Sequence, residues 1–181
     1  MGQAILTVLG QDKPGIIAAV TSTLAKAGCN LEDVSMTVLE GQFAMIVIVD
    51  SRKKDAAGIV RKIESVTSRL GLSCYWKPIK KKLGRAKKHA KGTSPYILSI
   101  YGRDRTGIVA QTSQILAARK LNITDLNSKI LGRGEQSLYL MILEVDVPKS
   151  HRVEALQSSL RRLASKLKVD LTLKPVDTIE I

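Results

Sequence analysis

A nine-residue motif occurs twice in this chain and constrains its fold more than any other feature. Gly10 to Ala18 reads Gly-Gln-Asp-Lys-Pro-Gly-Ile-Ile-Ala, and Gly102 to Ala110 reads Gly-Arg-Asp-Arg-Thr-Gly-Ile-Val-Ala. Each copy follows an apolar run typical of a strand and precedes residues with helical spacing. The repeat therefore predicts two domains of about 90 residues each.

The two halves show the same order of predicted elements, strand–helix–strand–strand–helix–strand. Turn signals at Glu40-Gly41 and at Gly132-Arg133-Gly134 predict a hairpin in the middle of each half. The strands are predicted at 3–9, 30–39, 43–49 and 72–77, and at 95–101, 122–131, 137–147 and 168–174. This order predicts an α+β fold of two ferredoxin-like βαββαβ units, each with an antiparallel sheet and both helices on one face. Free edge strands would favour packing the units side by side.

The helices between these strands are predicted from the spacing of apolar residues. In the first helix of each half, the predicted buried faces are Ile17, Val20, Leu24 and Ala27, and Val109, Thr112 and Leu116. In the second helix of each half they are Ile59, Ile63, Val66 and Leu70, and Val153, Leu156, Leu160, Leu163 and Leu167.

The repeated motif has the residue types of an anion-binding helix start. Asp12 and Asp104 are predicted N-cap residues, whose carboxylates accept the backbone N–H at Gly15 and Gly107. The missing Cβ at these glycines permits close approach, and free N–H groups at a helix start favour a carboxylate. The same residues also suit a plain strand-to-helix turn, so the motif alone leaves both interpretations open.

Positive charge is concentrated between the two halves. Of the net charge of +13, eight positive charges fall between Lys77 and Lys91, where no acidic residue occurs. A solvated linker is the first interpretation, contact with a protein partner the second and nucleic-acid binding the third. Aromatic residues make up only 3% and no recognition helix is evident, so sequence-specific nucleic-acid binding is not expected.

Chemistry-bearing residues are sparse. The two histidines lie away from the repeated motif, the two cysteines have no His at metal-ligand spacing, and no nucleophile-and-base pattern occurs. We therefore expect no enzyme activity, no metal and no cofactor. No apolar run is long enough to cross a membrane, and the N-terminus does not resemble a signal peptide, so a cytoplasmic protein is expected.

The element order and the Asp-[Lys/Arg]-[Pro/Thr]-Gly-Ile-[Ile/Val] turn resemble the ACT domain, a small module that binds amino acids. Two such domains in one short chain are similar to the glycine cleavage system transcriptional repressor group. The implied division is a first ACT domain at 1–78, a basic linker at 79–94, a second ACT domain at 95–176 and a tail at 177–181.

The resemblance implies a ligand site at domain interfaces, and the free edge strands lead us to expect a homodimer. The implied site residues are Asp12, Pro14, Gly15, Ile16 and Asn30 in the first half, and Asp104, Thr106, Gly107, Ile108 and Asn122 in the second. A small amino acid such as glycine or serine would fit there, and a transcriptional regulator is the implied protein partner. A ligand-free dimerisation adaptor and a weak nucleic-acid binder acting through the linker are the alternatives.

The chain departs from the family pattern at two places. Many amino-acid-sensing members have His or another polar residue where this chain has Gly10 and Gly102. Thr106 also replaces the commoner proline.

Overall fold

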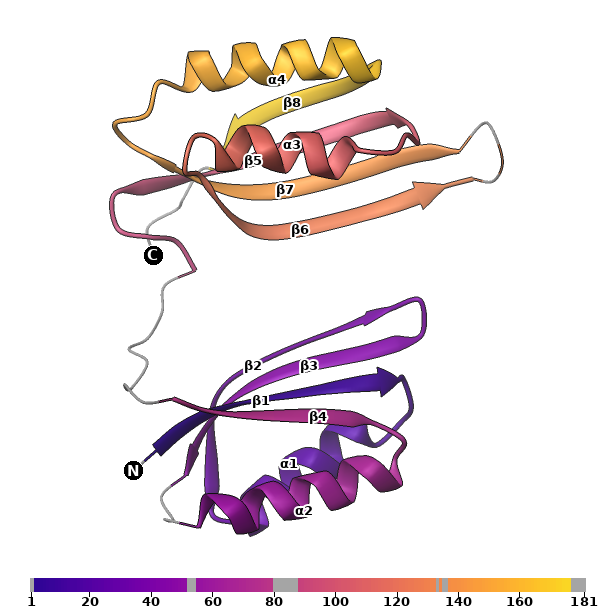
Figure 1. Cartoon of the computed structure of the whole chain (residues 1–181), viewed down its shortest axis with the longest axis vertical. Coiled ribbons are helices and arrows are strands. Elements are labelled where there is room, and N and C mark those ends of the chain that lie inside the picture. Colours follow the sequence, from indigo (N-terminus) through magenta and orange to yellow (C-terminus); the bar gives the residue numbers. More distant parts are fainter. Residues whose placement is uncertain (1, 52–54, 80–87, 133, 135–136, 177–181) are drawn as a thin grey trace. The chain divides into compact units, whose positions relative to one another are not determined.

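The computed structural model describes residues 2–51, 55–79, 88–132, 134 and 137–176. The chain divides into two compact units, residues 1–86 and 87–181 (Figure 1). Residues 80–87 of the predicted linker, Arg133 of the predicted second hairpin and the predicted tail lie outside the described residues.

The first unit is a four-stranded antiparallel sheet in the order β2-β3-β1-β4, with two helices. Strand β1 is central and pairs with both β3 and β4. Its elements are β1 (Gly2–Gln11), α1 (Ile16–Lys26), β2 (Cys29–Leu39), β3 (Gln42–Ser51), α2 (Ala56–Arg69) and β4 (Ser73–Ile79). The predicted element order of this half is confirmed.

The second unit repeats this topology, with strand order β6-β7-β5-β8 and central strand β5. Its elements are β5 (Thr93–Arg103), α3 (Ile108–Ala117), β6 (Asn122–Leu131), β7 (Leu138–Pro148), α4 (Val153–Leu167) and β8 (Val169–Pro175). An irregular register also recurs, between Leu31 and Asp33 in β2 and between Ile123 and Asp125 in β6. The predicted ferredoxin-like α+β fold is therefore confirmed in both halves.

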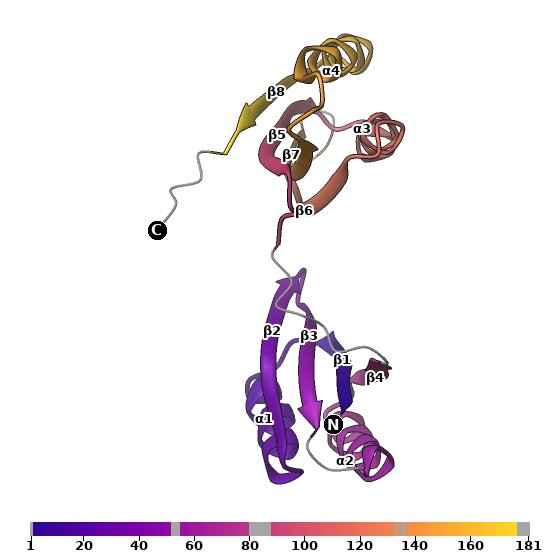
Figure 2. The ribbon, with the colours of Figure 1, turned by 90° about the vertical axis from the view of Figure 1, so that its left-hand side faces the viewer.

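Each unit has its own core between the sheet and the helices. In the first unit, Leu6, Val8, Met45 and Val47 pack with Leu24 of α1 and other buried helix residues. The helices of each unit cover one face of its sheet, as Figure 2 shows for α3 and α4. The opposite sheet face carries alternate residues of the same strands, because successive side chains of a strand point to opposite sides.

The predicted buried face of the first helix is wrong by one residue in each unit. Ile16 and Ile108 are each 2% exposed, whereas Ile17 is 45% and Val109 is 39% exposed. Ile16, Val20 and Leu24 recur at i, i+4 and i+8, which fits a helical face as well as the predicted spacing does. The turn before the helix sets which of the two neighbours faces the sheet.

None of the helices in the described part of the chain has the length and hydropathy needed to cross a bilayer.

Candidate functional site

The repeated motif forms a tight turn that ends in a left-handed glycine. Gly15 has φ 93° and ψ −8°, and Gly107 has φ 95° and ψ 2°. These angles match the third residue of a type II turn, where glycine is favoured and proline is common one position earlier. Pro14 occupies that earlier position in the first unit and Thr106 in the second. This turn explains why both copies have glycine at Gly15 and Gly107. It also explains why the preceding residue can be either proline or threonine.

The prediction that Asp12 and Asp104 are N-cap residues is wrong. Gly15 and Gly107 occupy the N-cap positions, and no side chain caps either helix. The two aspartates lie three residues earlier, where their backbone N–H groups donate to the carbonyls of Gly41 (2.8 Å) and Ser137 (3.3 Å). These bonds tie the turn to the neighbouring hairpin, and both carboxylates stay exposed.

The helix starts consequently keep unpaired donors. The first N–H groups of an α-helix have no partner within the helix, and here no side chain replaces one. Their partial positive charge attracts an anion. The buried side chains of Ile16 and Ile108 belong to the cores, so these two predicted site residues present only backbone to the turn.

At Gly10 and Gly102, the space that a side chain would need is occupied by Leu72 and Val169, respectively. A Cβ at Gly10 would lie 2.6 Å from Leu72 Cδ2, and one at Gly102 would lie 2.8 Å from Val169 Cγ1. A polar side chain at Gly10 would therefore displace the Leu72 side chain, and one at Gly102 would also press on the Val169 Cα, which would lie 3.0 Å away at the start of β8. The departure from the family pattern follows from this close packing.

The structure does not bring Asn30 to the turn of its own unit. Asn30 of β2 pairs with Asp50 of β3, and Asp50 pairs with Gln3 of β1. Gln3 lies at the opposite end of β1 from Gln11, the strand residue next to the turn. At roughly 3.3 Å per residue along a strand, the eight steps from Gln3 to Gln11 span about 26 Å. Asn122 pairs with Asp146 and has the same position in the second unit. A single small ligand cannot contact both ends of one sheet.

An apolar surface follows one edge strand of each unit, β2 or β6, and was not predicted from the sequence. In the first unit it comprises Ile17, Val34, Met36 and Val38, which are 43–46% exposed. Val34, Met36 and Val38 lie opposite buried β3 residues, on the sheet side that carries the helices. In the second unit it comprises Val109, Leu126 and Ile130. We call these the β2 edge surface and the β6 edge surface. Their equivalent positions in the two copies of the repeat are the signal that could have found them.

The two turns differ in their surroundings. A Cβ at Gly15 would meet no atom within 4 Å, whereas at Gly107 it would lie 3.0 Å from Nε2 of Gln111. Oε1 of Gln111 accepts a hydrogen bond from Lys166 Nζ at 2.9 Å, which links the turn to α4. Ala19 stands at the position equivalent to Gln111 in the first unit, so the Gly15 turn is the more open.

Three residues of the predicted linker, Lys88, His89 and Ala90, contact the second sheet. Lys88 Nζ lies 2.8 Å from Glu144 Oε1, and His89 Nδ1 lies 2.8 Å from Asp146 Oδ1. The Ala90 N–H donates to Asp146 Oδ2 at 2.9 Å. Chiefly because of its hydrogen bond with Lys88, and also that with Thr124, Glu144 has a pKa below its ordinary value. Residues 88–90 are thus part of the second unit's surface and not free linker.

Comparison with known proteins agrees with this fold. The ACT domain family model matches residues 3–76 and 94–174. A UPF0237 protein of Methanopyrus kandleri is 46% identical over 57 residues, which are 32% of this chain and 63% of that protein. A crystal structure of an unknown protein from Galdieria sulphuraria is 26% identical with a TM-score of 0.80, covering 97% of this chain and 98% of that one. A crystal structure of a candidate glycine cleavage system transcriptional repressor is 17% identical with a TM-score of 0.71, covering 98% of both chains.

Proposed function

This chain belongs to the ACT domain family, and we propose that it is a non-enzymatic regulatory protein that binds a small amino acid at its Gly15 and Gly107 turns. The observation that carries the proposal is the uncapped helix start after a left-handed glycine, present in both units. An amino-acid carboxylate would accept hydrogen bonds from the free N–H groups there. The exposed carboxylate of Asp12 or Asp104 would pair with the ammonium group.

The position of Asn30 supports a site completed by a second copy of the chain. If two β2 strands pair along their free edges in antiparallel fashion, the Cys29 end of one strand meets the Leu39 end of the other. Leu39 adjoins the hairpin residue Gly41, whose carbonyl accepts the Asp12 N–H. Asn30 of one copy would therefore lie toward the turn of the other, and the β2 edge surface would be buried between them.

Glycine or serine is the ligand we expect, because the turn offers glycine and aliphatic neighbours and no polar group placed to recognise a longer polar side chain. The likeness to a candidate glycine cleavage system transcriptional repressor motivates a partner that controls transcription of amino-acid metabolism genes. Regulation requires that the ligand bind the partner-bound and free forms with different affinity, since equal affinity shifts no equilibrium.

Thermal unfolding in the presence of single amino acids tests the proposal. A ligand present at about one hundred times its dissociation constant stabilises by roughly 2.7 kcal/mol per site, which shifts the midpoint by several degrees. We expect a selective shift with glycine or serine. The absence of a shift with every amino acid would favour the adaptor alternative, in which the domains only dimerise.

Two variants in the first unit separate a shared site from a site confined to the turn. Asp12→Asn and Asn30→Ala should each weaken binding roughly tenfold, although the two residues lie at opposite ends of one sheet. Both variants should be made in a chain that carries Asp104→Asn, so that the second turn does not mask the loss. Unchanged affinity in Asn30→Ala would confine the ligand to one copy, and Asp33→Asn, an exposed substitution on the same strand, is the matched control.

The nucleic-acid alternative rests on the cations of residues 77–91. Lys80, Lys81, Lys82, Arg85 and Lys87 lie outside the described residues, while Lys88 pairs with Glu144. Replacing the first five by glutamine should leave amino-acid binding unchanged under our proposal. Loss of the regulatory activity together with any salt-dependent DNA binding would favour the alternative.

A further inference from the structure

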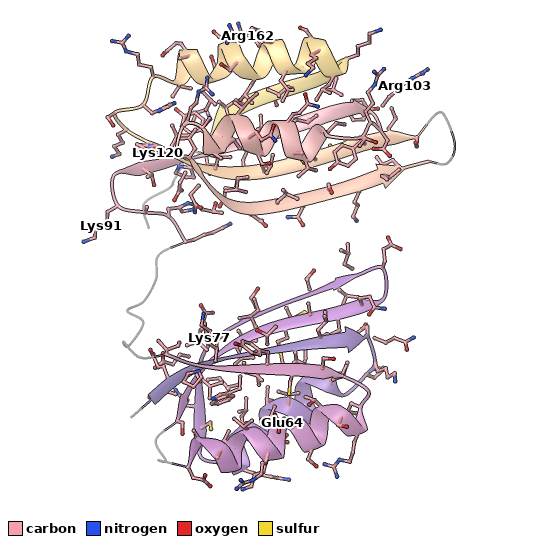
Figure 3. All side chains as sticks on the ribbon, viewed as in Figure 1. Glu64, Lys77, Lys91, Arg103, Lys120 and Arg162 are labelled. Atoms are coloured by element: carbon pink, nitrogen blue, oxygen red, sulfur yellow. The ribbon has the colours of Figure 1, made fainter. Side chains whose placement is uncertain are left out.

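A groove between α3 and α4 on the helical face of the second unit contains two arginines that meet at one hydroxyl group. Arg119 donates to Ser159 Oγ at 2.5 Å, and Arg162, which lies on α4 (Figure 3), donates to the same oxygen at 3.1 Å. Ser159 is only 9% exposed. The hydroxyl therefore fixes two like charges beside each other at the wall of the groove.

This arginine pair has no anionic partner within the described residues. No carboxylate in the described ranges lies within ion-pair distance of Arg119 or Arg162, and none lines the groove. A third cation, Lys166, lines the same groove, and its amino group is held by Gln111. Each guanidinium has five donors, so most of them are left for another acceptor.

The groove has the size and the mixed lining of a small-molecule site. Its volume is about 460 Å³, within the range of ligand pockets. Ile115, Ala118 and Leu163 supply apolar surface beside the three cations. A ligand with a multiply charged anionic group and an apolar part would contact both the three cations and the apolar side chains.

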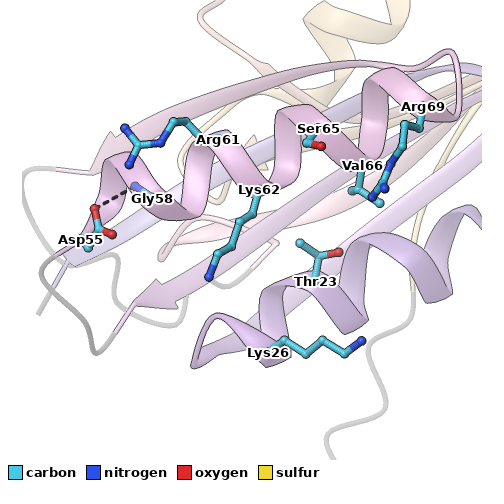
Figure 4. A pocket seen from close by; sticks show the side chains of 9 residues that line it. All are labelled: Thr23, Lys26, Asp55, Gly58, Arg61, Lys62, Ser65, Val66 and Arg69. Atoms are coloured by element: carbon cyan, nitrogen blue, oxygen red, sulfur yellow. Dashed lines mark hydrogen bonds between the residues drawn. The ribbon is translucent and has the colours of Figure 1, made fainter.

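The first unit has a basic groove at the equivalent place, between α1 and α2. Figure 4 shows Lys62 and Arg69 extending from α2 toward α1 in this groove of about 570 Å³. Lys26 and Arg61 also line it. Among the described residues its one carboxylate, Asp55, accepts the Gly58 N–H at 2.8 Å as a helix cap. The recurrence of unpaired cations between the helices indicates that the feature belongs to the repeat, and the arginine pair distinguishes the second copy.

We propose that the α3–α4 groove binds the phosphate group of a small organic phosphate, with Arg119 and Arg162 as a paired clamp and Lys166 as a third cation. Arginine forks match phosphate oxygens in geometry, and a phosphate carries enough charge to balance more than one cation. A nucleic-acid backbone fits less well, because the three cations surround one compact groove and do not form an extended track. The proposal does not depend on the amino-acid site at the turns, although Gln111 lies beside both the Gly107 turn and this groove.

Nuclear magnetic resonance titration of the full chain with inorganic pyrophosphate tests the proposal residue by residue. At physiological salt we expect saturable shifts of the Ser159 and Ile115 amides. Arg162→Gln should weaken binding about tenfold or more, as expected on removal of a charge-assisted hydrogen bond. Arg161→Gln is the matched control, because Arg161 has the same charge and the adjacent position on α4 but does not line this groove.

Ser159→Ala tests the clamp without changing any charge and is expected to weaken pyrophosphate binding about threefold or more. The absence of shifts, equal losses in Arg161→Gln and Arg162→Gln, or unchanged affinity in Ser159→Ala would each overturn the proposal. A short DNA duplex that shifts the same amides more strongly than pyrophosphate, at equal phosphate concentration, would overturn it in favour of a nucleic-acid contact.

Discussion

His89 Nδ1 lies 2.8 Å from Asp146 Oδ1, although the two residues are 57 positions apart in the chain. The same carboxylate accepts the Ala90 N–H with its other oxygen and is only 3% exposed. The end of the predicted linker is therefore fixed to β7 by a buried acceptor.

Asp146→Ala should reduce the unfolding free energy of the second unit by about 1–3 kcal/mol, because it leaves the Ala90 N–H and the His89 ring without their acceptor. Urea denaturation measures the change. The matched control is Asp50→Ala, since Asp50 holds the equivalent position in β3 and its carboxylate accepts no hydrogen bond from the side chain or backbone of another described residue. Equal losses in the two variants would contradict the role given to the attachment.

The Lys88–Glu144 pair should stabilise the second unit only between two pH limits. Because the hydrogen bond with Lys88 lowers the pKa of Glu144 from 4.5, the stability it contributes is present above that value and is lost as pH falls through the folded-state pKa. Because the hydrogen bond with Glu144 raises the pKa of Lys88 from 10.5, its contribution is present below that value and is lost as pH rises through the folded-state pKa.

Lys88→Gln should therefore lower stability near neutral pH, and its difference from the unmodified protein should shrink as pH falls through the folded-state pKa of Glu144. Urea denaturation of the two proteins from neutral to acidic pH makes the comparison. Lys91→Gln removes a nearby exposed charge that has no carboxylate partner among the described residues. Its effect should not change with pH, and a difference that persists at low pH in Lys88→Gln would argue against the ion pair.

Thr112→Val should stabilise the second unit by about 1 kcal/mol. Thr112 is fully buried and its Oγ1 has no hydrogen-bond partner in the described structure, whereas the equivalent residue of the first unit is the buried Val20. Valine has nearly the same shape and removes the unpaired hydroxyl group. The reciprocal change, Val20→Thr, should destabilise the first unit by about 1–3 kcal/mol, and thermal unfolding of both variants would reveal whether the opposite signs occur.

Ile16→Ala and Ile17→Ala should separate stability from association. Ile16 is 2% exposed and Ile17 is 45% exposed, although they are neighbours of the same type. Ile16→Ala should cost about 2–5 kcal/mol by leaving a cavity, and Ile17→Ala less than about 1 kcal/mol.

If the β2 edge surface is buried between copies, Ile17→Ala should also weaken self-association in analytical ultracentrifugation. A dimer of unchanged affinity would exclude Ile17 from the contact, and a monomer at all concentrations in the unmodified protein would exclude the contact itself.

The sequence by itself determined the repeat, the order of the elements and the ferredoxin-like fold. Strand and helix patterns depend on neighbours within a few residues, and two copies of the motif supported the same interpretation. The left-handed conformation of Gly15 was accessible from the sequence although it was not predicted, because Pro-Gly before an apolar run is typical of a type II turn.

Only the tertiary structure decided which residues from distant parts of the sequence lie close together. It placed Asn30 at the far end of the sheet from Asp12, and it gave the N-cap position to Gly15. It also joined His89 to Asp146 and Arg119 to Arg162 through Ser159. These contacts depend on strand register and helix packing between distant segments, which local periodicity does not specify because neighbouring registers and helix rotations satisfy the same pattern.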